Sequence, residues 1–190
     1  MKITPLGIAG AWKVTPQQHG DARGLFLEVF RNSAFERAVG HRFELAQVNC
    51  SVSTRGTVRG IHYADVPPGQ AKYVTCLVGH IRDVIVDIRV GSPTYGHSEV
   101  VDLDDESRCA VFLSAGLGHG FAAIAQSSTV AYLCSTEYSP GREHEVHPLD
   151  PALAIDWGLE AAEVSLSAKD AAAPLLADAA QAGALPRFIA

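Results

Sequence analysis

An arginine, a histidine and a lysine stand close together in the segment RGIHYADVPPGQAKYV, Arg59 to Val74. Histidine titrates near neutral pH, so His62 can serve as a general base. Arg59 and Lys72 can hold an anion or offset negative charge on an oxygen. The turn-like sequence ADVPPGQ lies between two apolar runs. Two interpretations are open: a solvated hairpin tip, or one wall of a pocket for an anionic ligand.

Three other histidines lie in segments that could contribute to a functional site. His119 lies between two glycines in LSAGLGHGFAAI, where glycine permits either a tight turn or a close approach of the backbone to a ligand. His144 and His147 lie three residues apart in EHEVHP, but the flanking sequence is not helical and a proline follows. Metal sites in jelly rolls of the cupin type often contain a His-x-His pair. His62 is followed by Tyr63 and Ala64, so this pair is missing. We therefore expect no metal.

Two further residues with useful chemistry have plain structural explanations. Tyr132 lies in STVAYLCSTEY, where it reads as a strand aromatic packed in a core. Asp170 lies three residues after Ser167 in SAKD, the spacing of a helix capping motif. Local pattern alone would select neither residue as catalytic.

The segments that would position these side chains read as short strands. Alternating or β-branched runs follow one another between Lys72 and Tyr138, namely KYVTCLVG, HIRDVIVDIRV, SEVVDL, CAVFLS, GFAAIA and STVAYLCSTEY. In HIRDVIVDIRV the alternation predicts one core face and one largely polar face that carries Asp83, Asp87 and Arg89. Glycine- and proline-containing breaks separate the runs.

Helical signals are confined to the edges of the chain. SAFERAVG, Ser33 to Gly40, predicts one short helix with a serine start and a glycine stop. Ser167 to Gly183 predicts a C-terminal helix that is broken or bent near Pro174. The pattern predicts an all-β fold, a jelly-roll β-sandwich with short peripheral helices. We expect a single domain over residues 1–190, with the helical segment beginning at about residue 167.

Composition narrows the classes of function. The chain has 190 residues, of which 47% are hydrophobic and 19% charged, which is typical of a globular protein. Its net charge of −6 argues against nucleic-acid binding, because phosphate backbones require a basic surface. No apolar run is long enough to span a membrane, and the start of the chain does not resemble a secretory signal, so we expect a cytoplasmic protein. The four cysteines form no CxxC pair and should be free thiols.

A series of motifs in register resembles the dTDP-4-dehydrorhamnose 3,5-epimerase family. The series runs from about Pro5 to Pro186 and comprises DARGLFLEVF, QVNCSVSTRGTVRGIHY, QAKYV, DVIVDIRVGSPTYG, GHGF, VAYLCSTEYSP, DPALAIDW and LSAKDAAAPLL. The resemblance is strongest to actinobacterial members, which include enzymes that make deoxysugars for secondary metabolites. It implies a homodimeric, metal-free jelly roll of the cupin type. The implied substrate is a dTDP-linked 4-keto-6-deoxyhexose, with no cofactor.

The resemblance also assigns roles to residues. It implies His62 as proton acceptor supported by Asp170, Tyr132 as proton donor, and Lys72 as the partner of the C4 oxygen. Positions that match contacts to nucleotide, pyrophosphate or sugar are Arg23, Glu28, Gln47, Asn49, Arg59, His119, Glu143 and Lys169. Phe26 and Tyr138 match aromatic positions near the thymine. Because N-terminal strands exchange in such dimers, Arg23, Phe26 and Glu28 should serve the neighbouring subunit's pocket.

The chain departs from the common family pattern in two places. Ala64 stands where glutamine usually follows the HY pair, and EHEVHPLDP replaces the more usual E-x-G-I-x-W-x-DP. These changes leave open whether C3, C5 or both are inverted, which sugar is used, and whether nucleotide binding is altered. A 3,4-ketoisomerase, a non-catalytic nucleotide-sugar-binding cupin and a metal-dependent cupin oxygenase remain as alternatives. An intact His62 and Tyr132 favour the epimerase.

Overall fold

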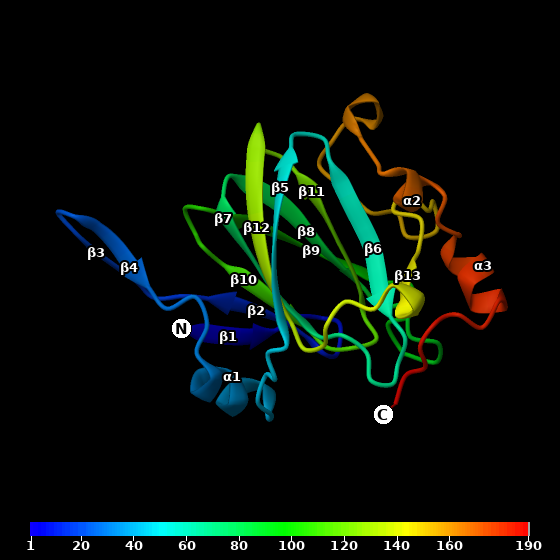
Figure 1. The fold of residues 1–190 in the computed structure, drawn as a ribbon, viewed down its shortest axis with the longest axis horizontal. Helices are drawn as coiled ribbons and strands as arrows, with labels where there is room; N and C mark the ends of the chain where they lie inside the picture. Colours follow the sequence, from blue (N-terminus) through cyan, green and yellow to red (C-terminus); the bar gives the residue numbers. More distant parts are fainter. Residues whose placement is uncertain (190) are drawn as a thin grey trace.

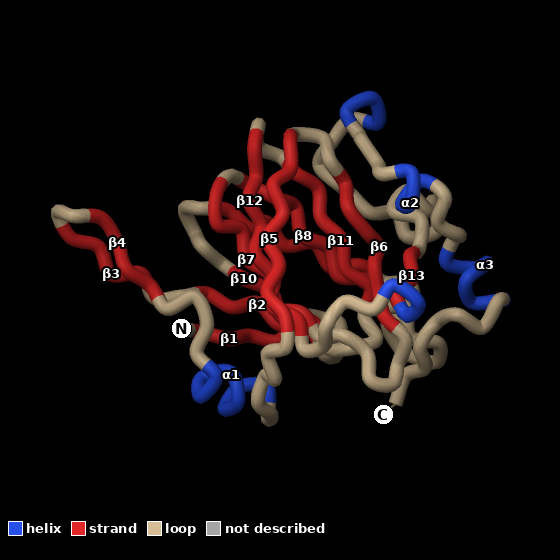
Figure 2. Tube along the Cα trace, in the orientation of Figure 1, coloured by secondary structure: helices blue, strands red, loops and turns tan. Residues whose placement is uncertain are grey.

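The computed structural model describes residues 1–189; Ala190, the last residue of the predicted domain, lies outside them. Its centre is a sandwich of two antiparallel sheets (Figures 1 and 2). The six-stranded sheet has the order β1 (Lys2–Pro5), β2 (Ala11–Thr15), β10 (Ala110–Leu113), β7 (Lys72–Val78), β12 (Ser127–Cys134) and β5 (Gln47–Thr54). The five-stranded sheet has the order β13 (Glu143–Glu145), β6 (Val58–Ala64), β11 (Gly118–Ala123), β8 (His80–Val86) and β9 (Ser98–Asp104). The predicted jelly-roll β-sandwich is confirmed.

Apolar side chains from both sheets fill the space between them. Val74 and Val111 of the six-stranded sheet share one buried cluster with Ile85, Leu103 and Phe121 of the five-stranded sheet. Burial of these alternate residues is the main stabilising contribution expected for such a sandwich. The core occupies only part of the interlayer space, and polar residues line the remainder, described below.

Strand β8 is buried on both faces, so the predicted polar face, which carries Asp83, does not lie toward solvent. Asp83 and Asp87 are 0% exposed. The outer face of the strand, with Val84 and Val86, is covered by the C-terminal segment, which contributes Leu176 to the same cluster. Buried carboxylates need partners. Asp87 bonds to neighbouring side chains of the loop that follows, and Asp83 bonds to a histidine on β11.

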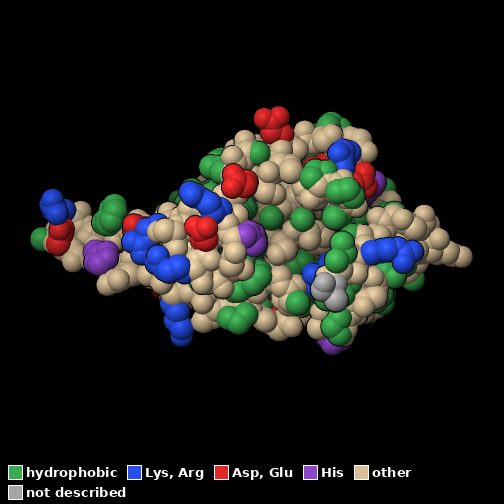
Figure 3. All heavy atoms as spheres, turned by 90° about the horizontal axis from the view of Figure 1, so that it is seen from below, with side chains coloured by type: hydrophobic (Ala, Val, Ile, Leu, Met, Phe, Trp, Pro, Cys, Tyr) green, Lys and Arg blue, Asp and Glu red, His purple; other side chains and the backbone are tan. Residues whose placement is uncertain are grey.

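The N-terminal hairpin stands apart from the sandwich. Strands β3 (Gln18–Asp21) and β4 (Gly24–Leu27) pair only with each other and project as an arm (Figures 1 and 3). Leu25 and Phe26 on this arm are 47% and 67% exposed. Large apolar side chains gathered on a projecting arm are typical of a segment that packs against a partner.

The helices are short and lie at the periphery, as predicted. Helix α1 (Asn32–Val39) ends at Gly40, which has the left-handed conformation with φ 95°. The predicted serine start is wrong, because the N-cap is Arg31, which makes no side-chain capping bond. The remaining helical elements are η1 (Pro140–Arg142), η2 (Ala161–Glu163), α2 (Ala168–Ala171) and α3 (Leu176–Gln181). The last two form the predicted C-terminal helical segment, which is broken at Pro174 as expected.

Strands β6 and β11 approach each other unusually closely at two glycines. Gly60 has φ 115°, and a Cβ atom placed there would lie 2.6 Å from the Cα atom of Gly120. A Cβ atom on Gly120 would lie 2.7 Å from the carbonyl oxygen of Arg59. Any side chain at either position would therefore force the two strands apart.

Two simpler expectations can be compared with the structure. The cysteines, Cys50, Cys76, Cys109 and Cys134, are all free. No helix within residues 1–189 has the length and hydrophobicity needed to cross a membrane.

Candidate active site

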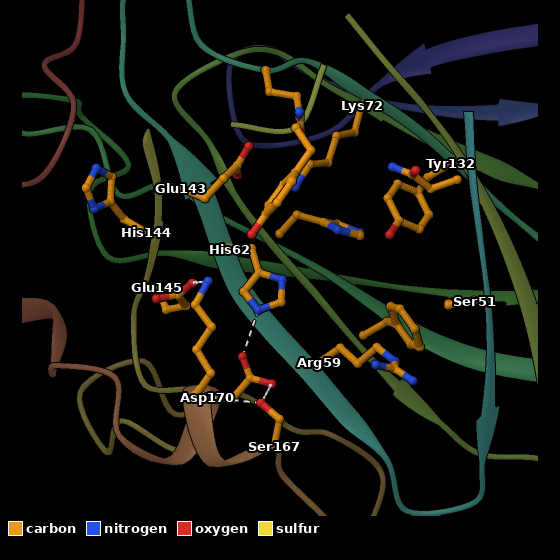
Figure 4. Close-up of a pocket in the computed structure, with 16 residues that line it drawn as sticks. Ser51, Arg59, His62, Lys72, Tyr132, Glu143, His144, Glu145, Ser167 and Asp170 are labelled. Atoms are coloured by element: carbon orange, nitrogen blue, oxygen red, sulfur yellow. Dashed lines mark hydrogen bonds and ion pairs between the residues drawn. The ribbon is translucent and has the colours of Figure 1, made fainter. Parts of the chain in front are cut away.

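A cavity of about 290 Å³ lies between the two sheets (Figure 4). Its volume is near the lower end of the range for small-molecule sites, roughly 300–1,000 Å³. The residues that line it are Asn49, Ser51, Arg59, His62, Gln70, Lys72, His119, Phe121, Tyr132, Tyr138, Glu143, His144, Glu145, Ser167, Lys169 and Asp170. Most are polar or ionisable, so the cavity is suited to a ligand with many oxygen atoms.

A histidine–aspartate pair lies on the five-stranded side of the cavity. His62, in the middle of β6, places Nε2 2.7 Å from Oδ1 of Asp170 on α2. Ser167, the N-cap of α2, accepts a bond from the backbone N–H of Asp170 and donates one to its Oδ2 at 2.8 Å. A proton on Nε2 leaves Nδ1 as the basic atom, and Figure 4 shows this second ring nitrogen turned away from Asp170.

The charge state of Asp170 follows from its contacts. Burial alone would raise the pKa of this carboxyl, but the hydrogen bonds from His62 and Ser167 outweigh it, so the pKa lies below its ordinary value. Asp170 is therefore ionised at neutral pH. An ionised partner fixes the tautomer of His62 and stabilises the imidazolium that forms when His62 takes up a proton.

The six-stranded side of the cavity presents a lysine and a tyrosine. Lys72 begins β7 and is 7% exposed, and no residue within 1–189 forms an ion pair with it. Burial lowers the pKa of this ammonium, while Cys134 and Glu143 oppose the shift. Tyr132 lies on β12, and burial raises the pKa of its phenol. In Figure 4 the Tyr132 ring lies across the cavity from His62.

An irregular register brings Arg59 and His62 to the same cavity. In a regular strand, residues three apart point to opposite faces. The pairing of β6 with β11 shifts between His119 and Phe121, so that His62 pairs with His119 while Arg59 pairs with Phe121. Arg59 donates from Nε to the Ser53 hydroxyl at 3.1 Å, and its terminal nitrogens make no hydrogen bond to residues 1–189, so they are available to a ligand.

His119 is the more deeply buried of the two paired histidines. Its Nε2 lies 2.8 Å from Oδ2 of Asp83, and its side chain is 9% exposed. The second carboxylate oxygen of Asp83 is buried and has no hydrogen-bond partner among residues 1–189. This bond to a buried carboxylate fixes the orientation of the His119 ring.

The far end of the cavity is formed by amides and an exposed aromatic ring. Gln47 donates to Asn49 at 2.6 Å and accepts a bond from the backbone N–H of Tyr138 at 2.8 Å. Tyr138 is 58% exposed, so one face of its ring is open for stacking. Lys169, on α2, forms an ion pair with Glu145 of β13.

The two histidines that could have suggested a metal are used separately. His144 Nε2 lies 2.7 Å from Asp65, whereas His147 Nδ1 accepts a bond from the backbone N–H of Leu149 at 3.1 Å. Within residues 1–189 no group of three or more histidine, cysteine, aspartate or glutamate side chains has a metal-binding arrangement.

Comparison with known proteins identifies the family. The family model described as dTDP-4-dehydrorhamnose 3,5-epimerase matches residues 5–178. The chain is 56% identical to a dTDP-4-dehydrorhamnose 3-epimerase of Streptomyces niveus, over 99% of this chain and 90% of that protein. It is 51% identical to a dTDP-4-dehydrorhamnose 3,5-epimerase of Mycobacterium tuberculosis, over 99% and 94% of the two chains.

The chain belongs to the dTDP-4-dehydrorhamnose 3,5-epimerase family. It is therefore an isomerase, as predicted. Its fold is also similar to the crystal structure of a 4-keto-6-deoxy sugar epimerase from the novobiocin biosynthetic gene cluster of Streptomyces spheroides. That comparison gives a TM-score of 0.97 at 56% identity and covers 99% of this chain and 94% of the other.

The structure brings most of the predicted site residues of this epimerase to one cavity. Those that line it are His62, Lys72, Tyr132, Asp170, Asn49, Arg59, His119, Tyr138, Glu143 and Lys169. Gln47 lies one contact behind, bonded to Asn49 and Tyr138. Arg23, Phe26 and Glu28 do not line the cavity of their own chain. Arg23 lies in the turn of the projecting hairpin, where it pairs with Asp21.

Sequence reasoning missed several residues that line the cavity. They are Ser51, Gln70, Phe121, His144, Glu145 and Ser167. Ser51 and Phe121 follow Asn49 and His119 at a spacing of two, so strand alternation could have found them. Ser167 was predicted as a helix cap, and that role is confirmed. Gln70 lies in a loop and carries no such signal.

Proposed function

We propose that this epimerase inverts C3, C5 or both in a dTDP-linked 4-keto-6-deoxyhexose, by deprotonation to an enolate and reprotonation from the opposite face. The observation that carries the proposal is the arrangement of the cavity. A histidine–aspartate pair, His62 with Asp170, faces a partly buried tyrosine on the opposite sheet. Beside it lies a buried lysine that forms no ion pair with any residue from 1 to 189.

The first step is removal of a proton next to the ketone. A 4-keto group acidifies the hydrogens on C3 and C5, because the carbanion is delocalised onto the ketone oxygen. His62 takes this proton on Nδ1 while its Nε2–H remains bonded to Asp170. The Asp170 carboxylate then stabilises the imidazolium. No redox or metal cofactor is required for this proton transfer.

Lys72 stabilises the enolate. It is buried and lacks a carboxylate partner among residues 1–189, so its positive charge is available to the oxygen on which negative charge develops. Electrostatic stabilisation of this kind is strong inside a cavity that excludes water. Its cost is the desolvation of the ammonium, which is seen in the lowered pKa of Lys72.

Inversion requires a proton from the other face of the ring. Tyr132 stands across the cavity from His62, and its raised pKa keeps the phenol protonated at neutral pH. An enolate carbon is basic enough to take that proton. The phenolate formed lies in the same cavity as Arg59, whose charge favours it.

The remaining polar residues suit the nucleotide. Arg59 can donate charge-assisted hydrogen bonds to a pyrophosphate, and His119 lines the same cavity as a further contact. Tyr138 offers a stacking surface to a pyrimidine ring, and Asn49 and Glu143 offer hydrogen bonds to sugar or base. Lys169 provides a further cation at the rim of the cavity, and Gln47 orients Asn49 and the Tyr138 backbone. These roles rest on the proposed substrate.

We also propose that the enzyme is a homodimer with exchanged N-terminal arms. The projecting β3–β4 hairpin exposes Leu25 and Phe26, and it carries Arg23 and Glu28 away from the cavity of its own chain. Exchange would place these residues at the partner's cavity and bury the apolar surface.

The free cysteines further support a reducing compartment, in keeping with a cytoplasmic enzyme.

Turnover of dTDP-4-keto-6-deoxyglucose in deuterated water tests the reaction. NMR should show deuterium at the carbons that are deprotonated and inverted configuration at those that are epimerised. Exchange and inversion at C3 alone would assign a 3-epimerase, and at both carbons a 3,5-epimerase. Migration of the ketone to C3 would instead indicate a ketoisomerase, and no exchange at any carbon would refute the proposal.

Mixing of two variants tests the dimer. Arg23→Ala subunits combined with His62→Ala subunits should regain activity, because one cavity of each mixed dimer has both residues intact. If subunits demonstrably exchange and no activity returns, Arg23 acts within its own chain.

A further inference from the structure

Glu145 is a carboxylate inside the cavity to which the mechanism gives no part. It lies directly opposite His62 in the pairing of β13 with β6, so the two side chains share the cavity face of the sheet. Its side chain is 14% exposed, and its carboxylate pairs with the Lys169 ammonium, whose side chain is 57% exposed. Figure 4 shows Glu145 beside the His62 ring.

The ion pair distinguishes Lys169 from the other permanent cations of the cavity. Arg59 and Lys72 form no ion pair with any residue from 1 to 189, so both remain available to an anionic ligand. Lys169 is already paired, and the bond that it donates to Glu145 raises its pKa. A nucleoside diphosphate that binds Lys169 must therefore displace the Glu145 carboxylate.

We propose that Glu145 is an affinity-tuning residue that occupies Lys169 and thereby weakens the binding of the nucleoside diphosphate part of the substrate. This inference rests on the proposed function. When the diphosphate approaches Lys169, one anion replaces another at the same ammonium, and the freed Glu145 carboxylate remains in a cavity that also holds Glu143 and Asp170. The net gain from the Lys169 contact is therefore small.

Weak binding of the nucleotide suits this reaction. Substrate and product of an epimerase carry the same nucleotide, so each contact to it binds both equally. Such uniform binding does not accelerate the chemical step, and it holds the product as firmly as the substrate. Because Glu145 competes for Lys169, the enzyme can contact the nucleotide without slowing the release of the product.

A purely structural role explains the ion pair less well. Helix α2 is held independently by the Ser167 cap and by the bond between Asp170 and His62. Lys169 is more than half exposed, and exposed ion pairs contribute little to stability. Removing the Glu145 charge should therefore change ligand affinity more than folding.

Calorimetric titration with thymidine diphosphate tests the proposal in four proteins: the wild type, Glu145→Gln, Lys169→Met and the double variant. Glu145→Gln should bind about tenfold more tightly, equivalent to about 1.4 kcal/mol, and its affinity should fall more steeply with salt. Lys169→Met should weaken binding by less than about threefold. The double variant should match Lys169→Met, because the gain needs the lysine. In turnover, Glu145→Gln should lower KM without raising kcat.

Controls separate this effect from general changes in charge. Glu163→Gln breaks a comparable pair with Arg55 on the surface, 3.0 Å long, and should leave affinity unchanged. Glu145→Ala should repeat the tighter binding if the glutamine variant is unstable. Unchanged or weaker binding by both Glu145 variants would overturn the inference, as would equal tightening in the Lys169→Met background. Failure of the wild type to bind thymidine diphosphate would overturn the proposed function with it.

Discussion

The two walls of the cavity differ in how their polar side chains are satisfied. On the wall formed by the five-stranded sheet and α2, His62 is bonded to Asp170 at 2.7 Å and His119 to Asp83 at 2.8 Å. On the six-stranded wall, neither the Lys72 ammonium nor the Tyr132 hydroxyl has a hydrogen-bond partner among the described residues, 1 to 189. The two histidines are therefore already oriented by the protein, whereas Lys72 and Tyr132 keep their bonding capacity for a ligand.

This difference matches the proposed chemistry. A base needs a fixed tautomer and a stabilised conjugate acid in the free enzyme, so its partner must be part of the protein. A group that stabilises an enolate oxygen or delivers a proton to carbon must instead have its bonding capacity free. Substitutions on the two walls should therefore impair catalysis in different ways.

The largest effect is expected from His62→Asn. This change removes the base while keeping a side chain that can bond Asp170, so the fold should persist. Turnover and deuterium incorporation should both fall by about 10² to 10⁴, the range for general acid–base catalysis. NMR in deuterated water measures both. Unaltered exchange, with circular dichroism showing an intact fold, would mean that another residue is the base.

Lys72→Met should cost about 10² to 10³ in kcat, as for loss of one preorganised group at a developing oxyanion. Because burial lowers the pKa of Lys72, wild-type activity should decline at a pH below the ordinary lysine value of 10.5 as the ammonium loses its charge. Arginine keeps its charge to higher pH, so Lys72→Arg should shift the alkaline decline of kcat upward. The same alkaline profile in Lys72→Arg and the wild type would assign that decline to another group.

Tyr132→Phe sharpens the comparison, because it removes only the hydroxyl. Inversion should fall by about 10²-fold, while exchange with solvent deuterium continues with retention of configuration, since His62 still forms the enolate. The ratio of exchange to inversion, followed by NMR, is the measurement. Complete loss of exchange, with thymidine diphosphate binding preserved, would contradict the assignment of base and acid to opposite walls.

The smallest effect is expected from Ser167→Ala, on the paired wall. It removes the cap of α2 and one bond to Asp170, which should destabilise the fold by about 1 kcal/mol. Because Asp170 keeps its bond to His62, activity should fall by less than about tenfold. Thermal unfolding and kcat/KM report the two effects. Ser167→Thr retains the hydroxyl and should behave like the wild type.

The sequence was most informative where function and local pattern coincide. His62, Arg59 and Lys72 fall within one short segment, so their proximity along the chain already suggested a shared site. Tyr132 and Asp170 had to come from the family resemblance. Asp170 is 108 residues away from His62 along the chain, and nothing in the SAKD motif indicates that contact. The jelly roll followed from strand alternation and turn residues, and it is confirmed.

The features that the sequence did not reveal depend on how the elements of the fold cover and pair with one another. Alternation predicted a largely polar face with Asp83 and Asp87, but it cannot reveal that this face of β8 lies inside the sandwich while the C-terminal segment covers the face with Val84 and Val86. Glu145 lies on a strand of three residues, which is too short to show a period. The register shift that turns Arg59 and His62 to the same cavity arises from the pairing of β6 with β11, and no single-strand pattern contains it.

The close approach of β6 and β11 at Gly60 and Gly120 also limits how this scaffold can be redesigned. Those strands carry His62 and His119, so a library that varied either glycine would mainly return proteins in which these two histidines are displaced, whatever sugar it was selected for. Adjustable positions lie elsewhere around the cavity. Ala64, a small residue, pairs with Glu143 of the edge strand β13, and Ser51 lies on the edge strand β5. Directed evolution toward new sugar nucleotides should therefore accumulate changes on and beside β5 and β13 while both glycines persist.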